Sequence, residues 1–365
     1  MNLSAVTTFG VYIHVPFCSR RCDYCAFATW DDKAGQIDDY MAALLTEVQC
    51  AGDAGLPPAG TVFVGGGTPS LVPSESLAEV IAAVRKTDDA EVTVECNPDN
   101  VTEPLLRTYR DAGVNRISLG VQSMVPHVLA SLGREHDADN VNAAVDAIRS
   151  VSLPTFNLDL IYGAHGESVD DWRATLRNAL ALHPPHVSAY ALTVEAGTPL
   201  ADDSARHPDD DDQADKYPVA DDALEAAGLA NYEISNWALP GHESRHNRLY
   251  WAQADYRGFG CAAHSHAAGR RWWNLRTPER YIEAVRRGQS TEAAFEELTS
   301  EQVAAERVQL TIRRREGAAR SDIAADKQPE IDEMVGDGLL VVEGDRVALT
   351  RHGRLLANAI TLRLT

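Results

Sequence analysis

Three cysteines lie within eight residues, in the segment Cys18-Ser-Arg-Arg-Cys22-Asp-Tyr-Cys25. Thiolates this close together suit a soft metal or an iron–sulfur cluster. A structural zinc site would need a fourth protein ligand. The position where another cysteine could follow holds Phe27, and His14 lies in an apolar run that predicts a strand. The spacing therefore favours a [4Fe-4S] cluster on three thiolates, with one iron open to a further ligand. A zinc loop is the alternative.

Composition narrows the classes of protein that could carry such a site. The chain has 33 basic and 54 acidic residues and a formal net charge of −21. A surface of this sign repels phosphate backbones, so we expect no nucleic acid partner. The first ten residues lack the basic start and apolar run of a signal peptide, and no stretch reaches the ~18 apolar residues of a transmembrane segment. We expect a cytoplasmic chain whose thiols stay reduced.

The elements that position the cysteines follow a repeated strand–helix pattern, which predicts an α/β fold with a parallel sheet. Amphipathic helical periods separate six short apolar segments. These predicted strands are Val11–Val15, Thr61–Val64, Glu91–Glu95, Arg116–Leu119, Thr155–Ile161 and Val187–Leu192. Six units fall short of the eight in a closed TIM barrel.

The length of 365 residues suits about two domains, at roughly 150 residues each. We expect a barrel over residues 1–225, an extension on its substrate or heme side over 226–290, and a small C-terminal domain over 291–365. In the last segment, helical periods precede a hairpin with its turn at Gly344-Asp345, a winged-helix-like α+β pattern. The acidic run Ala201–Lys216 is interpreted as a solvated loop, and Asn231–Ala268 as irregular.

The segment from Tyr12 to Cys25 resembles the radical S-adenosylmethionine (SAM) superfamily, in the branch of oxygen-independent coproporphyrinogen III dehydrogenases and heme chaperones. The resemblance runs from Tyr12 to at least Ser265. It implies a partial (β/α)6 radical-SAM barrel and a [4Fe-4S] cluster held by Cys18, Cys22 and Cys25. It also implies that SAM chelates the open iron, so that an electron from the cluster can cleave its sulfonium.

Polar and glycine positions near the ends of the predicted strands complete the implied SAM site. Glycines in Gly65-Gly66-Gly67-Thr68-Pro69 would let backbone approach a ligand. By the same resemblance, a first SAM would face Tyr12, Gly66 and Glu95. A second would face Tyr24, Gly67, Thr68, Gln122, Arg134, Asp159 and Ala191. Whether one or two SAM molecules bind stays open.

A second candidate site is the segment His246-Asn-Arg-Leu-Tyr250-Trp251. It resembles the H-N-x-x-Y-W motif of the heme chaperones. A neutral histidine is a natural axial ligand of heme iron, and aromatic rings offer flat apolar walls. We therefore predict His246 as a heme ligand, with a core aromatic cluster around a hydrogen-bonded histidine as the alternative.

Two departures from the dehydrogenases select between the branch members. Those enzymes carry a further cysteine where this chain has Phe27, and a long N-terminal extension where Tyr12 follows only eleven residues. Both features favour a heme chaperone that passes heme to an acceptor protein, with a reductant protein as a further partner. We assign no catalytic residue. The alternatives are a coproporphyrinogen III dehydrogenase and, disfavoured by the acidic balance, a DNA-binding winged-helix regulator.

Overall fold

A computed structural model describes residues 9–365; most of the opening ten residues therefore lies outside the described part. Six parallel strands follow one another in chain order across the centre of the main sheet. They are β1 (Gly10–Val15), β2 (Ala59–Gly66), β3 (Lys86–Cys96), β4 (Arg116–Gln122), β5 (Thr155–Tyr162) and β6 (His186–Ala191). The six predicted strands and the α/β class are thus confirmed.

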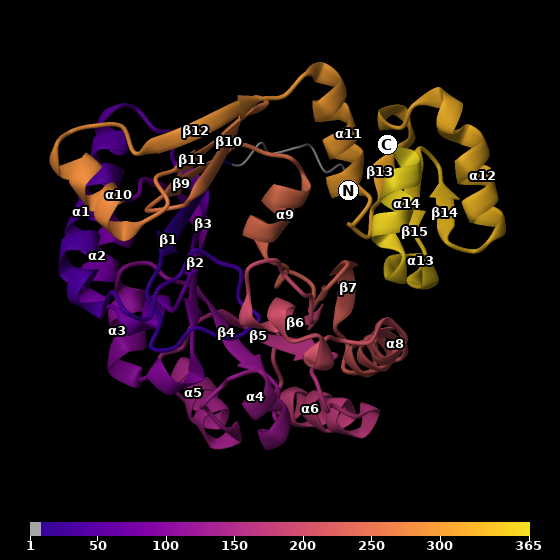
Figure 1. Cartoon of the computed structure of the whole chain (residues 1–365), viewed down its shortest axis with the longest axis horizontal. Coiled ribbons are helices and arrows are strands. Elements are labelled where there is room, and N and C mark those ends of the chain that lie inside the picture. The colour runs from indigo at the N-terminus through magenta and orange to yellow at the C-terminus, as the bar shows by residue number, and fades with distance from the viewer. Residues whose placement is uncertain (1–8) are drawn as a thin grey trace.

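Helices cover the outer face of these strands (Figure 1). They are α1 (Ile37–Asp53), α2 (Ser74–Ala83), α3 (Glu103–Asp111), α4 (Pro126–Ser131), α5 (Ala138–Ser150) and α6 (Val169–Ala181). Alternate strand residues such as Val11, Ile13 and Val15 are buried and belong to the main hydrophobic core. The other strand positions face inward and include Glu95, Ser118 and Asp159, which line an internal cavity. Pleating therefore separates an apolar outer layer from a polar interior.

The sheet extends beyond the six strands on both sides, so the barrel is partial. Its order is β12-β11-β10-β9-β1-β2-β3-β4-β5-β6-β8-β7. The added strands are β7 (Ala230–Glu233), β8 (Asn236–Ala238), β9 (Tyr256–Phe259), β10 (His264–Ala267), β11 (Arg270–Asn274) and β12 (Glu292–Glu297). The prediction that Asn231–Ala268 is irregular is wrong, because this segment supplies β7 to β10. Strands of three or four residues are too short to show a clear alternation.

Four helices lie between these added strands or lead into them: α7 (Pro199–Asp202), α8 (Asp210–Ala226), α9 (Arg245–Trp251) and α10 (Pro278–Arg286). The prediction that Ala201–Lys216 is one solvated loop is wrong. The Asp209 side chain accepts a hydrogen bond from the Asp212 N–H and caps α8, whose first turn holds three aspartates. Carboxylates stabilise a helix N-terminus through its exposed N–H groups, so this acidic run begins a helix.

The C-terminal region forms a small α+β unit with its own core, as the winged-helix-like pattern predicts. Its elements are α11 (Ser300–Thr311), β13 (Ala318–Ala319), α12 (Gln328–Gly336), β14 (Leu340–Glu343), β15 (Arg346–Leu349), α13 (Arg351–Leu355) and α14 (Ala357–Leu364). A separate hydrophobic cluster includes Val308, Met334 and Ile360. The boundaries at 225 and 290 stay a prediction.

Ion pairs attach this unit to α8, which lies beside it in Figure 1. The fully buried Asp221 carboxylate lies 2.9 Å from Arg351 Nε and 3.3 Å from Arg354 Nη2. It also accepts a 2.7 Å hydrogen bond from the Trp237 indole. Among residues 9–365, no helix is long and apolar enough to cross a membrane.

Candidate functional site

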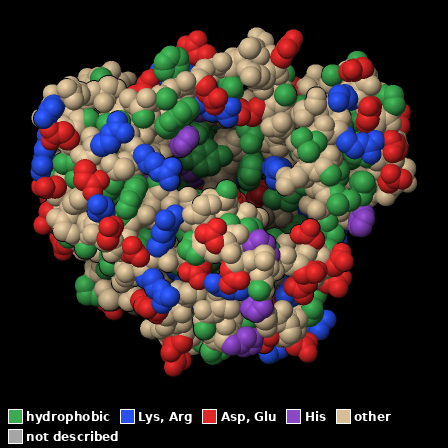
Figure 2. Space-filling model, viewed as in Figure 1, with side chains coloured by type: hydrophobic (Ala, Val, Ile, Leu, Met, Phe, Trp, Pro, Cys, Tyr) green, Lys and Arg blue, Asp and Glu red, His purple; other side chains and the backbone are tan. Residues whose placement is uncertain are grey.

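A cavity of about 1440 Å³ lies at the carboxyl ends of the parallel strands, where barrel proteins bind their ligands. The cysteine loop, strand ends from β2 to β6, the first turns of α8 and the α13–α14 segment all contribute to its wall. Figure 2 shows the molecule hollowed near the centre of one face, with hydrophobic side chains inside the hollow and charged ones around it.

Twelve of the fourteen predicted site residues line this cavity. They are Cys18, Cys22, Tyr24, Cys25, Gly66, Gly67, Thr68, Glu95, Gln122, Arg134, Asp159 and Ala191. The residues come from seven segments far apart in the sequence, and the barrel brings them to one place. Tyr12 and His246 are not among the residues on its wall.

The cysteine loop is fixed at its start by a short backbone ladder. The Cys18 N–H donates to the Trp30 carbonyl at 3.0 Å, and the Trp30 N–H donates to the Pro16 carbonyl at 2.8 Å. All three cysteines are half-buried free thiols. Burial raises the pKa of Cys18 and of Cys25, and the neighbouring thiols raise each further. Burial and the neighbouring thiols therefore disfavour the thiolate forms when no metal is bound. A bound cluster would supply the positive charge that stabilises these thiolates.

The glycine turn after β2 packs closely against the cysteine loop. A Cβ at Gly67 would lie 3.0 Å from Cys18 Sγ and 2.5 Å from the Phe17 carbonyl oxygen. Within the described part of the chain, no three histidine, cysteine or carboxylate side chains converge on a single metal ion. Three thiols on one cavity wall, without a fourth protein ligand among the described residues, fit a cluster with three protein ligands better than a closed zinc site.

Glu95 lies at the end of β3, against the same turn. Its Oε2 accepts a hydrogen bond from the Gly66 N–H at 3.2 Å. A Cβ at Gly65 would lie only 2.8 Å from that oxygen. Burial raises the pKa of Glu95 to about 8, and the nearby Asp159 charge contributes to the increase. A cationic or hydrogen-bonding ligand would therefore stabilise the ionised form of this carboxyl.

Asp159 lies inside the barrel on β5, in a polar network. Its carboxylate accepts hydrogen bonds of 2.7 Å from the Ser118 hydroxyl and from the Asn157 amide. Burial nevertheless raises the pKa of Asp159. The neighbouring Gln122 has a φ of 61°, beside an irregularity in the β4–β5 pairing. This left-handed kink ends the strand and places Gln122 on the cavity wall.

Arg134 follows α4 and is held between two cavity residues. It donates to the Tyr24 hydroxyl and to the Asn97 amide oxygen, both at 3.3 Å. Its Nε is buried and has no hydrogen-bond partner among the described residues. A planar guanidinium held by neutral partners is suited to receive a carboxylate. Asn97 was missed by sequence reasoning, although it stands two residues after Glu95.

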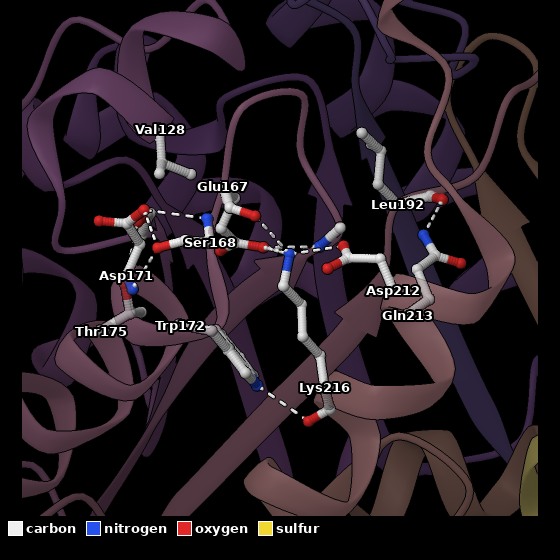
Figure 3. Close-up of polar contacts among 12 residues, drawn as sticks. Val128, Glu167, Ser168, Asp171, Trp172, Thr175, Leu192, Asp212, Gln213 and Lys216 are labelled. Carbon is white, nitrogen blue, oxygen red and sulfur yellow. Dashed lines mark hydrogen bonds and ion pairs between the residues drawn. The ribbon is translucent and has the colours of Figure 1, made fainter.

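The α8 wall of the cavity depends on a buried lysine that no motif signalled (Figure 3). The Lys216 ammonium is fully enclosed, 2.6 Å from Asp212 Oδ2 and 3.1 Å from Glu167 Oε2, and it donates to the Glu167 carbonyl. The adjacent Gln213 donates to the Leu192 carbonyl at 2.8 Å. These contacts pin the first turns of α8 to the ends of β5 and β6. Asp210, Asp211 and Gln213 consequently join the cavity wall, all within the misread acidic run.

His246 lies elsewhere, on α9, and is 0% exposed. Its Nδ1 is 2.9 Å from the Thr61 hydroxyl, and its backbone N–H donates to Glu91. The ring stacks on Phe63 with centroids 5.3 Å apart. Burial lowers the pKa of His246 to about 3, so the ring is neutral. Its Nε2 has no hydrogen-bond partner in the described part of the chain. The surroundings are those of the alternative interpretation, a hydrogen-bonded histidine in an aromatic cluster.

Tyr12 belongs to the same cluster. Its ring stacks on Phe63, with the two centroids 6.4 Å apart. Its hydroxyl lies 2.9 Å from His14 Nδ1, and His14 Nε2 lies 2.9 Å from the Ala28 carbonyl. The structure thus connects Tyr12 to the cysteine loop through His14 and does not place it on the cavity wall.

Comparison with known proteins identifies relatives of this architecture. Residues 12–179 match the family model of the Radical SAM superfamily. The heme chaperone HemW of Mycobacterium tuberculosis (strain H37Rv) is 42% identical over 98% of this chain and 94% of its own length. The heme chaperone HemW of Escherichia coli is 35% identical over 96% of both chains. Among solved structures, the coproporphyrinogen III oxidase HemN of Escherichia coli matches with a TM-score of 0.86 and 21% identity, over 98% of this chain and 90% of that one.

Proposed function

The chain belongs to the HemW family within the radical SAM superfamily, and from this premise we propose that it is a heme chaperone. It binds heme, carries a [4Fe-4S] cluster with SAM on the open iron, and delivers heme to an acceptor protein. The observation that carries the cofactor part is the single cavity that gathers Cys18, Cys22 and Cys25 with Glu95 and Arg134. The family relatives, which are named for heme, carry the substrate part.

Each group on the wall has a role toward the cofactor. The three thiolates hold the cluster, which when bound supplies single electrons and an open iron that the amino and carboxylate groups of SAM can chelate. Arg134 is suited to the SAM carboxylate and Glu95 to a ligand amine or hydroxyl. Gly66 and Gly67 lie on the cavity wall, where their backbone can approach the ligand closely. Gln122 and Asp159 offer hydrogen-bonding groups farther along the strand ends.

Phe27 distinguishes the chaperone from the dehydrogenase alternative. It lines the cavity beside the cysteine loop and is 63% exposed. A phenyl ring there can neither ligate a metal nor transfer a proton, unlike the cysteine of the dehydrogenase branch. The similarity to HemN shows the fold alone and does not favour the enzyme.

The heme ligand stays part of the proposal. Ligation by His246 requires its Nε2 to become accessible, and this means displacing the Phe63 and Tyr250 rings that lie 5.3 and 4.6 Å from its own. Tyr250 lies on the same helix as His246, α9, whereas Phe63 lies on β2, so a shift of α9 would separate His246 from Phe63 alone. We further propose a cytoplasmic location, where the thiols stay reduced, and a reductant protein as a partner.

The test is anaerobic reconstitution of the full chain with iron and sulfide, followed by heme titration and a coproporphyrinogen III turnover assay. We expect saturable binding of about one heme per chain, seen as a Soret band, and no turnover with SAM and reductant. Turnover to protoporphyrinogen IX would replace the chaperone with the dehydrogenase. Absence of saturable heme binding would overturn the proposal.

A further inference from the structure

Five arginines lie on the cavity wall: Arg20, Arg21, Arg134, Arg313 and Arg354. Four of these five have a partner or a role close by. Arg20 pairs with Glu135, and Arg354 with Asp221. Arg21 donates to the Cys25 carbonyl, and Arg134 lies between Tyr24 and Asn97 in the SAM region. The remaining arginine on the wall is Arg313, which comes from the C-terminal domain.

Arg313 is a half-buried cation without an ion pair. It lies in the turn that follows α11, and no carboxylate of the described residues is within ion-pair distance of it. Its hydrogen bond goes to a neutral group, the Asn358 amide oxygen, at 2.6 Å. Burial lowers the pKa of Arg313, and the charge of Glu233 offsets this only in part. A desolvated guanidinium of this kind gains free energy when an anionic ligand reaches it.

The surface next to Arg313 is apolar and exposed to the cavity. Leu355 and Leu356, between α13 and α14, are 36% and 44% exposed although both line the cavity wall. Together these two neighbouring leucines give the cavity wall an apolar patch that a flat apolar ligand would cover. Arg313 also lies over the ring of Trp251, with the guanidinium carbon 5.8 Å from the centroid. It therefore connects the cavity to the aromatic segment that follows His246.

We propose that Arg313 binds a propionate carboxylate of the heme while the ring lies against Leu355 and Leu356. Heme combines a large apolar face with two carboxylates on one edge, and this wall combines an apolar face with one guanidinium that has no ion pair among the described residues. The inference rests on the proposed function and adds to it a position for the heme. The C-terminal domain then forms half of the heme site.

The test compares heme with iron protoporphyrin IX dimethyl ester, which has the same ring but no free carboxylate. Both are titrated, by visible absorbance, into the reconstituted full chain and into Arg313→Gln. We expect Arg313→Gln to weaken heme binding about ten- to a hundredfold, the range of a charge-assisted hydrogen bond, and to leave ester binding unchanged. Arg313→Lys should recover part of the loss. Arg315→Gln removes the same charge two residues away, off the cavity wall, and should change neither affinity.

A second variant tests the apolar half of the site. Leu356→Ser should weaken heme and ester alike, because both ligands place the same ring on that surface. Iron content and circular dichroism of each variant show whether the fold is retained. Equal loss of heme and ester in Arg313→Gln, or no loss of either, overturns the carboxylate anchor while the wild type still binds heme. A wild type that binds neither ligand overturns the proposed function itself.

Discussion

Glu95 on β3, Asp159 on β5 and Arg134 after α4 lie on the wall of a cavity, whereas Thr61 on β2 and Glu91, nearer the start of β3, lie under α9. Both regions are polar and face the barrel interior. In the first, the side chains keep unsatisfied atoms or raised pKa values that a ligand would correct. In the second, His246 Nδ1 is hydrogen-bonded to the Thr61 hydroxyl, and the backbone N–H groups of Arg245 and His246 donate to the Glu91 carboxylate.

Inward-facing polar residues on barrel strands are therefore not by themselves a ligand site. What decides is whether a later segment of the chain covers them. The α9 segment inserts His246 between Thr61 and Phe63, and so closes that end with a hydrogen bond and stacked rings. At the other end, Gly66 and Gly67 lie on the wall of the cavity. The open region is thus the one beside Gly66 and Gly67, and the closed region is the one under α9.

The largest expected effect is loss of the cluster. Cys18→Ser, Cys22→Ser and Cys25→Ser should each remove nearly all iron and visible absorbance after reconstitution, because serine is a poor ligand for iron–sulfur clusters. Cys50→Ser, at an exposed position, and Cys261→Ser, at a buried one, are the matched controls and should retain both. Iron and acid-labile sulfide per chain are the measurements. A comparable loss in either control would contradict the three-ligand assignment.

The next effect concerns the wall of the open region. Lys216→Met should destabilise the chain by about 3–5 kcal/mol, because it leaves the Glu167 and Asp212 carboxylates without their buried cation. Urea unfolding followed by circular dichroism measures the loss. The triple variant with Glu167→Gln and Asp212→Asn should recover most of it. A triple variant no more stable than Lys216→Met would show that the packing of the lysine chain matters more than its charge.

Much of this architecture could be predicted from the sequence, for identifiable reasons. The strands at Val11–Val15 and Thr155–Ile161 are short apolar runs between helical periods, and such local patterns survive in the fold. The cysteine spacing and the Gly65–Gly67 turn are chemically distinctive, and they lie together as expected. Each of these signals is contained in one segment of chain.

The features that could not be predicted from the sequence depend instead on contacts between segments that are distant in the chain. Lys216 stands in an acidic run, and only its enclosure by Glu167 shows that it fixes a wall. No local pattern shows that Arg313 lies on the same cavity wall as Ala191, which stands more than 100 residues earlier in the sequence. The motif at His246 has the composition of a heme site, but periodicity cannot show that α9 turns this histidine toward Thr61.

At the closed region, His246→Ala should destabilise the chain by about 2–4 kcal/mol, because it leaves a cavity against Phe63 and an unpartnered Thr61 hydroxyl. His352→Ala, at an exposed position on the cavity wall, should change stability by less than about 0.5 kcal/mol. Urea unfolding at pH 7.5 compares the two. Equal effects would mean that α9 does not close the barrel as firmly as its contacts indicate.

The pH dependence of the His246 contribution has a definite sign. Its pKa is lowered to about 3 in the folded chain, so the unfolded chain binds the extra proton first as the pH falls below about 6.5. The wild type should therefore lose stability relative to His246→Ala as the pH falls from 7 toward 5. A constant difference between the two proteins over this range would contradict a neutral, buried ring.

Glu95 at the open region should give the smaller effect with the opposite sign. Its pKa is raised to about 8, so the folded chain binds a proton that the unfolded chain has already released above about pH 4.5. Protein without cluster or SAM should then lose stability relative to Glu95→Gln as the pH rises from 5 to 8. We expect a relative change of about 1–3 kcal/mol, because the side chain is only half-buried and water screens part of the cost.

Urea midpoints at both pH values measure this relative change, with Glu91→Gln at the covered region as the control. Because Glu91 already has hydrogen bonds from the α9 backbone, the Glu91→Gln difference should not follow the same trend; if it did, the two regions would not differ in the way their contacts indicate.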